Sequence, residues 1–155
     1  MTIRRAQEHD IDAISKLLSQ VLEIHHKGRP DIFKPGAVKY KPSELLSLIK
    51  DNTRPVFVAE LDGKVAGYAF CIIQQHLNDN ILTDIKTLYI DDLCVDESLR
   101  GMHVGKALYE YVLGFAKEIG CYNLTLNVWE ENHSARKFYE NCGLAVQKTV
   151  LEKIL

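Results

Sequence analysis

Two glycines in the segment 100–106 mark a loop that could bind an anion. A hydrophobic run at residues 88–95 comes before this loop and is typical of a buried strand. After the loop, apolar residues recur at helical spacing as far as Ile119, and Gly120 can end that helix. The first turn of such a helix presents free N–H groups and the positive end of its dipole. The sequence therefore predicts a phosphate site formed by Arg100, Gly101, Met102, His103, Val104, Gly105 and Lys106.

The spacing of the glycines excludes two common nucleotide-binding loops. A nucleoside-triphosphate loop has four residues between its glycines and a hydroxyl residue after the lysine. Here Gly101 and Gly105 stand one residue too close, and Ala107 follows Lys106 without a hydroxyl. A dinucleotide loop needs three glycines in the pattern G-x-G-x-x-G, which the chain lacks.

A second segment, residues 132–144, reads N-H-S-A-R-K-F-Y-E-N-C-G-L. Together with Arg100 and Gly105 of the loop, it resembles the two signature motifs of the GNAT acyltransferase superfamily, Q/R-x-x-G-x-G/A and N-x-x-A-x-x-F-Y-E-x-x-G-F. Two positions depart from these motifs, because His103 stands at a usual glycine and Leu144 at a usual phenylalanine. The resemblance extends over nearly the whole chain.

This resemblance implies a fold and an activity. The fold is a mixed α/β (α+β) domain over residues 1–155, whose mostly antiparallel twisted sheet has a V-shaped splay between two parallel strands and is flanked by helices. The activity is N-acetyl transfer from the cosubstrate acetyl-CoA to a primary amine, by direct attack in a ternary complex and without a metal. In the family the splayed strand, here Leu93, Cys94 and Val95, pairs with the pantetheine arm. The resemblance also places Asn132, Ala135 and Tyr139 against coenzyme A.

Acyl transfer to an amine needs a group that accepts the amine proton and one that protonates the leaving thiolate. Asp92 is favoured as the base, with Asp91 as its rival. Successive strand residues point to opposite faces, so only one of the two can face the cleft unless a bulge intervenes. Alternatively, both are solvated charges at a sheet edge or helix-capping charges. Tyr139 is the candidate acid, because a phenol with a pKa of about 10 stays neutral at working pH, although it could instead be a packing residue.

Two other functions compete with direct transfer. Cys94 could form an acyl-enzyme, but an activated cysteine needs a neighbouring base or cation and the sequence places none beside it. A non-catalytic acyl-CoA sensor or interaction module could also use the same scaffold. The presence of both a carboxylate pair and Tyr139 favours the enzyme.

The acceptor amine is expected at the segment 25–33, where this fold usually shapes its acceptor pocket. The candidate substrate-binding residues are His26, Arg29, Asp31 and Phe33. Arg29 could hold a carboxylate and Asp31 an ammonium group, which would suit an amino acid or a peptide end. Equally, Arg29 and Asp31 could pair with each other and order the loop. Adjacent histidines without spaced cysteine or carboxylate partners do not predict a metal site.

Composition narrows the expected partners. A net charge of −2 over 155 residues gives no general attraction for nucleic acid or for an anionic membrane. Four cysteines without a C-x-x-C pair suggest reduced core thiols, and no apolar run is long enough for a membrane span. We therefore expect a cytoplasmic protein whose partner is an amine-bearing small molecule, peptide or protein, and a homodimer is compatible with the sequence.

Hydrophobic periodicity and turn residues predict the elements that position these groups. Asp-Gly at 62–63 supplies the positive φ that a two-residue hairpin turn needs. The segment 24–41 lacks periodicity and is predicted as a loop with at most a short helical turn. Strands are expected at 2–6, 56–61, 64–75, 85–95, 122–128 and 145–153, and helices at 10–23, 45–51, 104–119 and 134–142.

Overall fold

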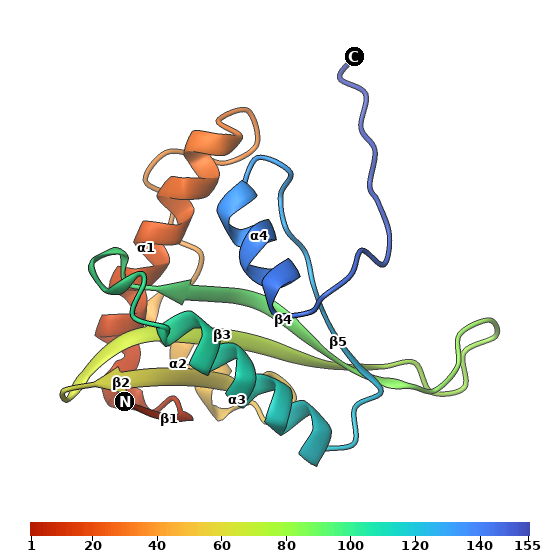
Figure 1. Ribbon diagram of the computed structural model, residues 1–155, viewed down its shortest axis with the longest axis horizontal. Helices are drawn as coiled ribbons and strands as arrows, with labels where there is room; N and C mark the ends of the chain where they lie inside the picture. The colour runs from red at the N-terminus through yellow and green to blue at the C-terminus, as the bar shows by residue number, and fades with distance from the viewer.

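The computed structural model covers residues 1–155 and contains one five-stranded sheet with helices on both faces (Figure 1). The first elements are β1 (Thr2–Arg5), α1 (Ile11–Gly28) and α2 (Pro42–Lys50). The strands β2 (Val56–Leu61), β3 (Lys64–Gln75) and β4 (Lys86–Val95) follow. The chain then forms α3 (Val104–Glu118), β5 (Asn123–Leu126) and α4 (His133–Asn141), and 3-10 turns occupy Glu8–Asp10 and Glu97–Leu99. None of these helices has the length and apolar character required to cross a membrane.

The strands lie in the order β1-β2-β3-β4-β5, and all neighbours are antiparallel except β4 and β5. The β2–β3 hairpin has the predicted bounds, and its turn residues Asp62 and Gly63 both have positive φ, 50° and 74°. The mostly antiparallel sheet, its one parallel pair and its flanking helices confirm the predicted fold class. The candidate site lies at the one parallel pair, where β4 runs beside β5.

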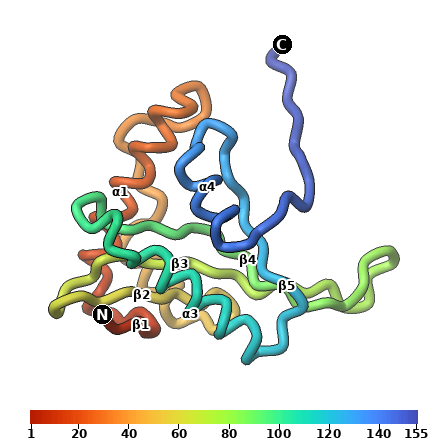
Figure 2. The backbone as a smooth tube through the Cα atoms, viewed as in Figure 1, coloured from red at the N-terminus to blue at the C-terminus, as the bar shows by residue number.

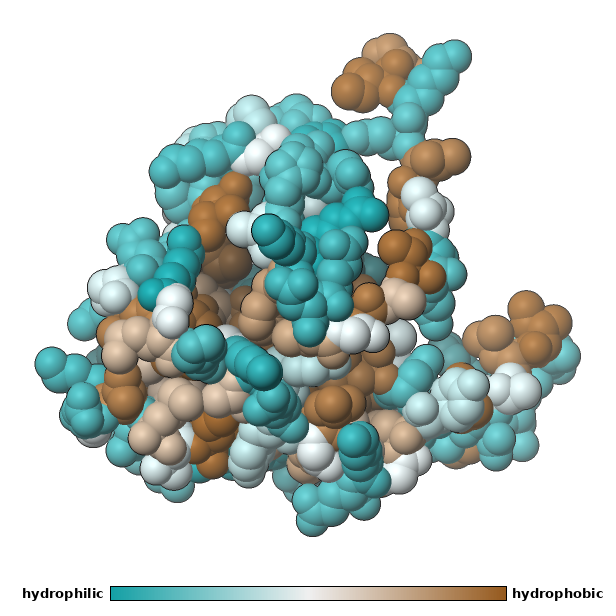
Figure 3. Space-filling view, viewed as in Figure 1, coloured by the Kyte–Doolittle hydropathy of each residue, from teal (hydrophilic) through white to brown (hydrophobic).

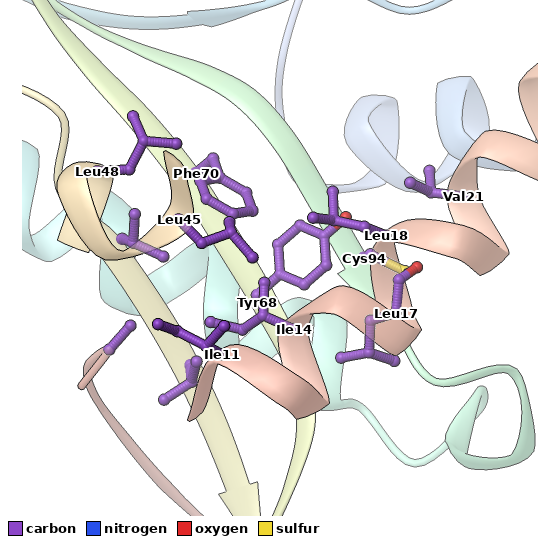
Figure 4. Packing of buried hydrophobic residues seen from close by; sticks show 13 residues of the cluster. Ile11, Ile14, Leu17, Leu18, Val21, Leu45, Leu48, Tyr68, Phe70 and Cys94 are labelled. Carbon is purple, nitrogen blue, oxygen red and sulfur yellow. The ribbon is translucent and has the colours of Figure 1, made fainter. Parts of the chain in front are cut away.

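Each face of the sheet carries its own hydrophobic cluster. Side chains of β2 alternate, so Val56 and Val58 pack with α1 and α2 while Phe57 and Ala59 pack with α3. Figure 4 shows the first cluster, in which Tyr68 and Phe70 of β3 lie against apolar side chains of α1 and α2. Because both faces are covered, β3 and β4 are held rigidly between the two helical layers.

Helix α1 is longer than its periodicity predicts, because it ends at Gly28 rather than near residue 23. The extra turn is stabilised by contacts with the loop that follows. The ring of His25 stacks on Phe33 with centroids 5.0 Å apart, and Nδ1 of His26 donates to the carbonyl oxygen of Phe33 over 2.7 Å. Such contacts depend on how the loop folds back, so the spacing of apolar residues within the helix does not reveal them.

The predicted closing strand at 145–153 does not form. No backbone hydrogen bond joins residues 145–155 to the rest of the chain, and β5 has β4 as its only strand neighbour. The segment has the residues of a strand, but a strand also needs a neighbouring strand to pair with. In Figure 2 this C-terminal segment extends away from the body of the molecule.

Candidate functional site

Pairing between β4 and β5 stops halfway along β4. The parallel register runs from Thr87 beside Asn123 to Ile90 beside Leu126 and goes no further. Beyond that point the two strands diverge, with β4 passing beneath α1 while β5 rises toward α4 (Figure 1). The predicted V-shaped splay is therefore present. Along Leu93, Cys94 and Val95, the edge of β4 that faced β5 has no strand partner.

A β-bulge lies at the start of the splay. In the β3–β4 ladder, Phe70 pairs with Asp92 and the next residue, Cys71, pairs with Ile90, so Asp91 is an extra residue. A bulge of this kind interrupts the strict alternation of side chains. Nζ of Lys39 lies 3.0 Å from Oδ2 of Asp91 and 3.8 Å from Oδ2 of Asp92. The two rival bases thus lie on the same side of the strand and share one cation.

Asp92 is the more deeply placed carboxylate, with 8% of its side chain exposed against 23% for Asp91. The hydroxyl of Tyr68 donates to Oδ2 of Asp92 over 2.9 Å. Burial raises the pKa of Asp92, while the charge of Lys39 and the hydrogen bond from Tyr68 oppose the rise without cancelling it. A carboxylate with a raised pKa is a stronger base than an exposed one, which suits proton abstraction from an amine.

Lys39 comes from the loop between α1 and α2, and no sequence pattern singled it out. Burial by itself lowers the pKa of Lys39, but the charges of Asp92 and Asp91 and the hydrogen bond to Asp91 outweigh burial and raise it. The side chain is therefore an ammonium ion. It shows that an ammonium group fits between the two carboxylates.

Tyr68 is a further site residue that the sequence did not reveal, and His25 lies in the predicted acceptor segment 25–33 but was not singled out there. Tyr68 reads as an ordinary strand residue, since only the β3–β4 register brings it beside the carboxylates. Burial lowers the pKa of His25, and the charge of Asp92 partly opposes this effect. His25 therefore stays neutral near pH 7, and it lies close enough to Asp92 for the charge of that carboxylate to affect its pKa.

The loop that is predicted to bind an anion leads directly into helix α3. Helix α3 begins at Val104, and no acceptor in the protein pairs with the N–H groups of Val104, Gly105 or Lys106. Gly101 has a φ of 84°, and His103 has a φ of 60°. Glycine is favoured at such a position because it carries no Cβ, whereas histidine can adopt the conformation at some cost. The side chain of His103 is exposed, so its backbone conformation is what shapes the loop.

Neither the backbone conformation nor the packing of the folded chain requires a glycine at position 105. Its φ is not positive, and an added Cβ would meet Val95 at 3.5 Å and Phe138 at 3.6 Å, which are ordinary contacts. The side chains of Arg100, Met102 and Lys106 are exposed around it. The loop therefore presents mainly main-chain groups to the space between α3 and the splayed end of β4.

Helix α4 closes the other side of the splay. Oδ1 of Asn132 accepts a hydrogen bond from the N–H of Ala135 over 3.2 Å, so Asn132 caps this helix. Tyr139 packs beside Phe138 with ring centroids 5.0 Å apart, and its hydroxyl makes no hydrogen bond to the protein. Burial raises the pKa of Tyr139, and the charge of Asp92 adds to the rise. The phenol is thus protonated and free to interact with a ligand.

Cys94 does not have the surroundings of a nucleophile. Its thiol is buried and lies 3.6 Å from the carbonyl oxygen of Leu17, to which it can donate. Burial is the main cause that raises the pKa of Cys94 to about 12. A thiol of this kind is not ionised near pH 7, so the acyl-enzyme alternative has no support in this geometry.

A cavity of about 350 Å³ lies at the C-terminal end of α1. The residues that line it are Ile24, His25, Gly28, Arg29, Phe33, Trp129, Glu131, Asn132, His133 and Ser134. Of the four candidate acceptor residues, Arg29 and Phe33 line this cavity, whereas His26 and Asp31 do not. Phe33 stands edge-on to Trp129, with ring centroids 5.4 Å apart, so one wall is aromatic.

Arg29 and Asp31 are paired with each other. Nε and Nη2 of Arg29 donate to the two carboxylate oxygens of Asp31 over 2.9 and 2.7 Å. A second carboxylate, that of Glu152, also pairs with Arg29. In this arrangement the charges of Arg29 and Asp31 are already matched, as expected if they order the loop.

Comparisons with known proteins all point to one family of acetyltransferases. Residues 18–144 match the model of the Acetyltransferase (GNAT) family. The chain is 30% identical over 110 residues to a glucosamine 6-phosphate N-acetyltransferase of Arabidopsis thaliana, covering 71% of this chain and 70% of that protein. It is 31% identical to an uncharacterised N-acetyltransferase of Archaeoglobus fulgidus, covering 93% of this chain and 92% of the relative. The crystal structure of a mutant protein from Bacillus halodurans superposes with a TM-score of 0.95 at 31% identity, covering 100% of this chain and 99% of that one.

The anion loop leads to a first prediction. Gly105→Asp should weaken the binding of acetyl-CoA by more than about tenfold, because it adds a carboxylate beside the phosphate position in a partly buried site. Isothermal titration calorimetry measures the affinity. Gly114→Asp is the matched control, since Gly114 lies in the same helix with open space around it, and it should bind like the parent. Equal affinity of the Gly105 variant and the parent would show that the phosphates bind elsewhere.

Proposed function

Because this chain belongs to the GNAT acetyltransferase family, we propose that it transfers an acetyl group from acetyl-CoA to a primary amine by direct attack in a ternary complex. The observation that carries the proposal is the ammonium ion of Lys39 held by Asp91 and Asp92 at the start of the splay. An ammonium group, a base and an unpaired strand edge are then close together. These are the parts that amine acylation needs.

The splayed end of β4 and the anion loop fit coenzyme A. The loop offers unpaired N–H groups at the positive end of a helix, as a pyrophosphate requires. The free edge of β4 along Leu93, Cys94 and Val95 offers backbone groups to the amide groups of a pantetheine arm. Bound acetyl-CoA would supply the thioester carbonyl carbon that the amine attacks.

The carboxylate pair would hold and deprotonate the acceptor amine. An incoming ammonium group would displace Lys39, because both need the same two carboxylates. Asp92 would take the proton, directly or through a water molecule, since its burial makes it the stronger base. Asp91 is more exposed and would orient the amine without being the final proton acceptor.

Tyr139 would protonate the departing sulfur. Its phenol keeps its proton at neutral pH, and its hydroxyl makes no bond to the protein that a ligand would have to break. The residues Asn132 and Ala135 at the start of the same helix would lie beside the cofactor, as the family motif implies. Asp92 would thus accept the proton of the amine, and Tyr139 would donate a proton to the thiolate.

The cavity beside α1 would receive the body of the acceptor. Its volume of about 350 Å³ suits a small molecule or the end of a peptide. Aromatic side chains line its walls, namely those of His25, Phe33 and Trp129. The carboxylate of Asp31 is already paired with Arg29 and is therefore not free to bind an acceptor. We therefore assign the acceptor ammonium to the Asp91–Asp92 pair rather than to Asp31. Amino sugars are worth testing, because the Arabidopsis relative is named for glucosamine 6-phosphate.

Turnover tests the proposal directly. The full chain is incubated with acetyl-CoA and with separate primary amines, namely a diamine, amino sugars including glucosamine 6-phosphate, and short peptides. Release of free thiol and a gain of one acetyl group on the acceptor are the expected results. Binding of acetyl-CoA without turnover of any amine would favour the acyl-CoA sensor instead.

A second prediction separates the two carboxylates. Asp92→Asn should lower kcat by about 10²- to 10⁴-fold, the range of a general base, with a smaller loss at alkaline pH where more amine is already deprotonated. Asp91→Asn should cost less, because the amide can still accept a hydrogen bond from the amine. Steady-state kinetics across pH measure both. A larger loss of kcat in Asp91→Asn than in Asp92→Asn would assign the role of base to Asp91.

A third prediction concerns the acid. Tyr139→Phe removes the proton donor but keeps the ring, so kcat should fall about 10²-fold or more while the affinity for acetyl-CoA stays close to that of the parent. Tyr122→Phe, at an exposed tyrosine, is the control and should change neither quantity. Unchanged kcat in the Tyr139 variant would leave that side chain with a packing role only.

A fourth prediction concerns Lys39, the cation between the two carboxylates. Lys39→Met removes the positive charge that opposes the raised pKa of Asp92, so this pKa should rise further. Because the base must be ionised, the acid limb of the kcat/KM profile should then move to higher pH. Lys34→Met removes an exposed lysine of the same loop and should leave the profile in place. An acid limb that does not move in the Lys39 variant would mean that Asp92 does not control it.

A further inference from the structure

Arg29 is the only side chain with a permanent positive charge among the residues that line the cavity beside α1. Its guanidinium is held in place, with 14% of the side chain exposed and Cζ lying 5.9 Å from the centre of the Trp129 ring. A guanidinium carries five N–H donors in a planar fork, so one arginine can bind two acid groups at once. Arg29 therefore has donors to spare after it has paired with Asp31.

Asp31 and Glu152 use different edges of this guanidinium. Asp31 accepts from Nε and Nη2. Glu152 lies at the outer end, where Nη1 donates to Oε1 over 2.5 Å and Nη2 donates to Oε2 over 3.3 Å. Asp31 stands two residues from Arg29, so its pairing is local and orders the loop. Glu152 is 123 residues away in the sequence, so its carboxylate reaches Arg29 from outside the loop.

The carboxylate of Glu152 is weakly held at this position. It belongs to the C-terminal segment 145–155, which makes no backbone hydrogen bond to the rest of the chain and no other ion pair. Figure 3 shows this segment standing out from the body of the molecule along most of its length. The side chain of Glu152 is 57% exposed, and exposed ion pairs contribute little to stability. Another acid group can therefore replace Glu152 at Arg29 at little cost.

An aromatic wall joins Arg29 to the region of the carboxylate pair. The ring centroids of Trp129 and Phe33 are 5.4 Å apart, and those of Phe33 and His25 are 5.0 Å apart. His25 in turn lies close enough to Asp92 for the charge of that carboxylate to affect its pKa. A small molecule that lies along this wall would therefore have one end toward Asp92 and the other beside Arg29.

We propose that the outer end of Arg29 is an anion subsite of the acceptor cavity, which Glu152 occupies in this structure and which binds a carboxylate or phosphate group of the acceptor. This inference rests on the proposed function, because it assigns the acceptor to primary amines that also carry an anionic group. When the acceptor binds, one acid group replaces another, so Arg29 keeps two partners and Asp31 stays paired. Glu131 is the only carboxylate among the lining residues, and it is exposed, so solvent screens its charge.

Titration with inorganic phosphate tests the subsite without any turnover. Trp129 is the only tryptophan of the chain, so its fluorescence reports binding beside Arg29. Phosphate should change this fluorescence saturably in the parent. Glu152→Gln should bind phosphate several-fold more tightly, because the competing carboxylate is gone. Glu140→Gln is the matched control, since Glu140 is an exposed acid that pairs with Arg136 in α4, and it should bind phosphate like the parent.

Two variants of Arg29 complete the titration. Arg29→Gln should abolish the saturable change, and Arg29→Lys should bind phosphate more weakly than the parent, because it keeps the charge but loses the fork. A misfolded loop would also lose binding, but it would not produce the tighter binding expected of Glu152→Gln. Equal affinity of the parent and Glu152→Gln, no saturable change in either, or a response that persists in Arg29→Gln would each overturn the subsite.

Acceptor kinetics distinguish a phosphate from a carboxylate. Glucosamine 6-phosphate is compared with glucosamine, and β-alanine with aminopropanol, so that each anionic amine has a neutral analogue. Arg29→Gln should raise KM for the preferred anionic amine by about tenfold or more, the loss expected for a charge-assisted pair, while KM for the neutral analogue stays close to that of the parent. Equal changes of KM for anionic and neutral amines would overturn the assignment of the acceptor. Absence of turnover with every amine would contradict the proposed function, and the phosphate titration would still decide the subsite.

Discussion

One extra residue in β4 determines how the site is built. With Asp91 inserted between Ile90 and Asp92, the ladder to β3 shifts register at the level where the ladder to β5 ends. The shift allows two neighbouring carboxylates to point toward the same lysine, which a regular strand does not permit. It also coincides with the splay that frees a strand edge. A single backbone irregularity thus places the charges and opens the binding surface at the same position.

The charges at the bulge explain why the Asp91–Asp92 pair would select a cation. Two carboxylates share one ammonium ion, so the cluster keeps a net negative charge when all three groups are ionised. Burial disfavours the ionised form of Asp92, and Lys39 and Tyr68 limit this effect. An acceptor that brings its own ammonium group can replace Lys39 without leaving a carboxylate unpaired, whereas a neutral acceptor could not. Under the proposed function, the two carboxylates are therefore already placed for an amine before any ligand binds.

The sequence predicted those features that depend on local spacing. The β2–β3 hairpin follows from Asp62-Gly63, and α3 from its apolar stripe, because turn conformation and helical period are encoded within a few residues. The longer α1 depends on His25 stacking on Phe33, and the lysine between the carboxylates depends on a loop without any pattern. Neither the bulge nor Tyr68 could be inferred, since the register between β3 and β4 follows from long-range packing. The segment 145–153 shows the converse, because its residues favour a strand but no neighbouring strand pairs with them.

His103 shows how a departure from a family motif can be understood physically. The usual glycine at this position meets a φ of 60°, a conformation that costs a residue with a Cβ about 1–2 kcal/mol. Histidine is among the residues that adopt it more readily, and the exposed ring meets no clash. The loop therefore keeps its shape, and its N–H groups keep their direction, at a modest cost in stability. What the proposed anion site needs at this point is a backbone conformation, and any residue that can hold that conformation can stand there.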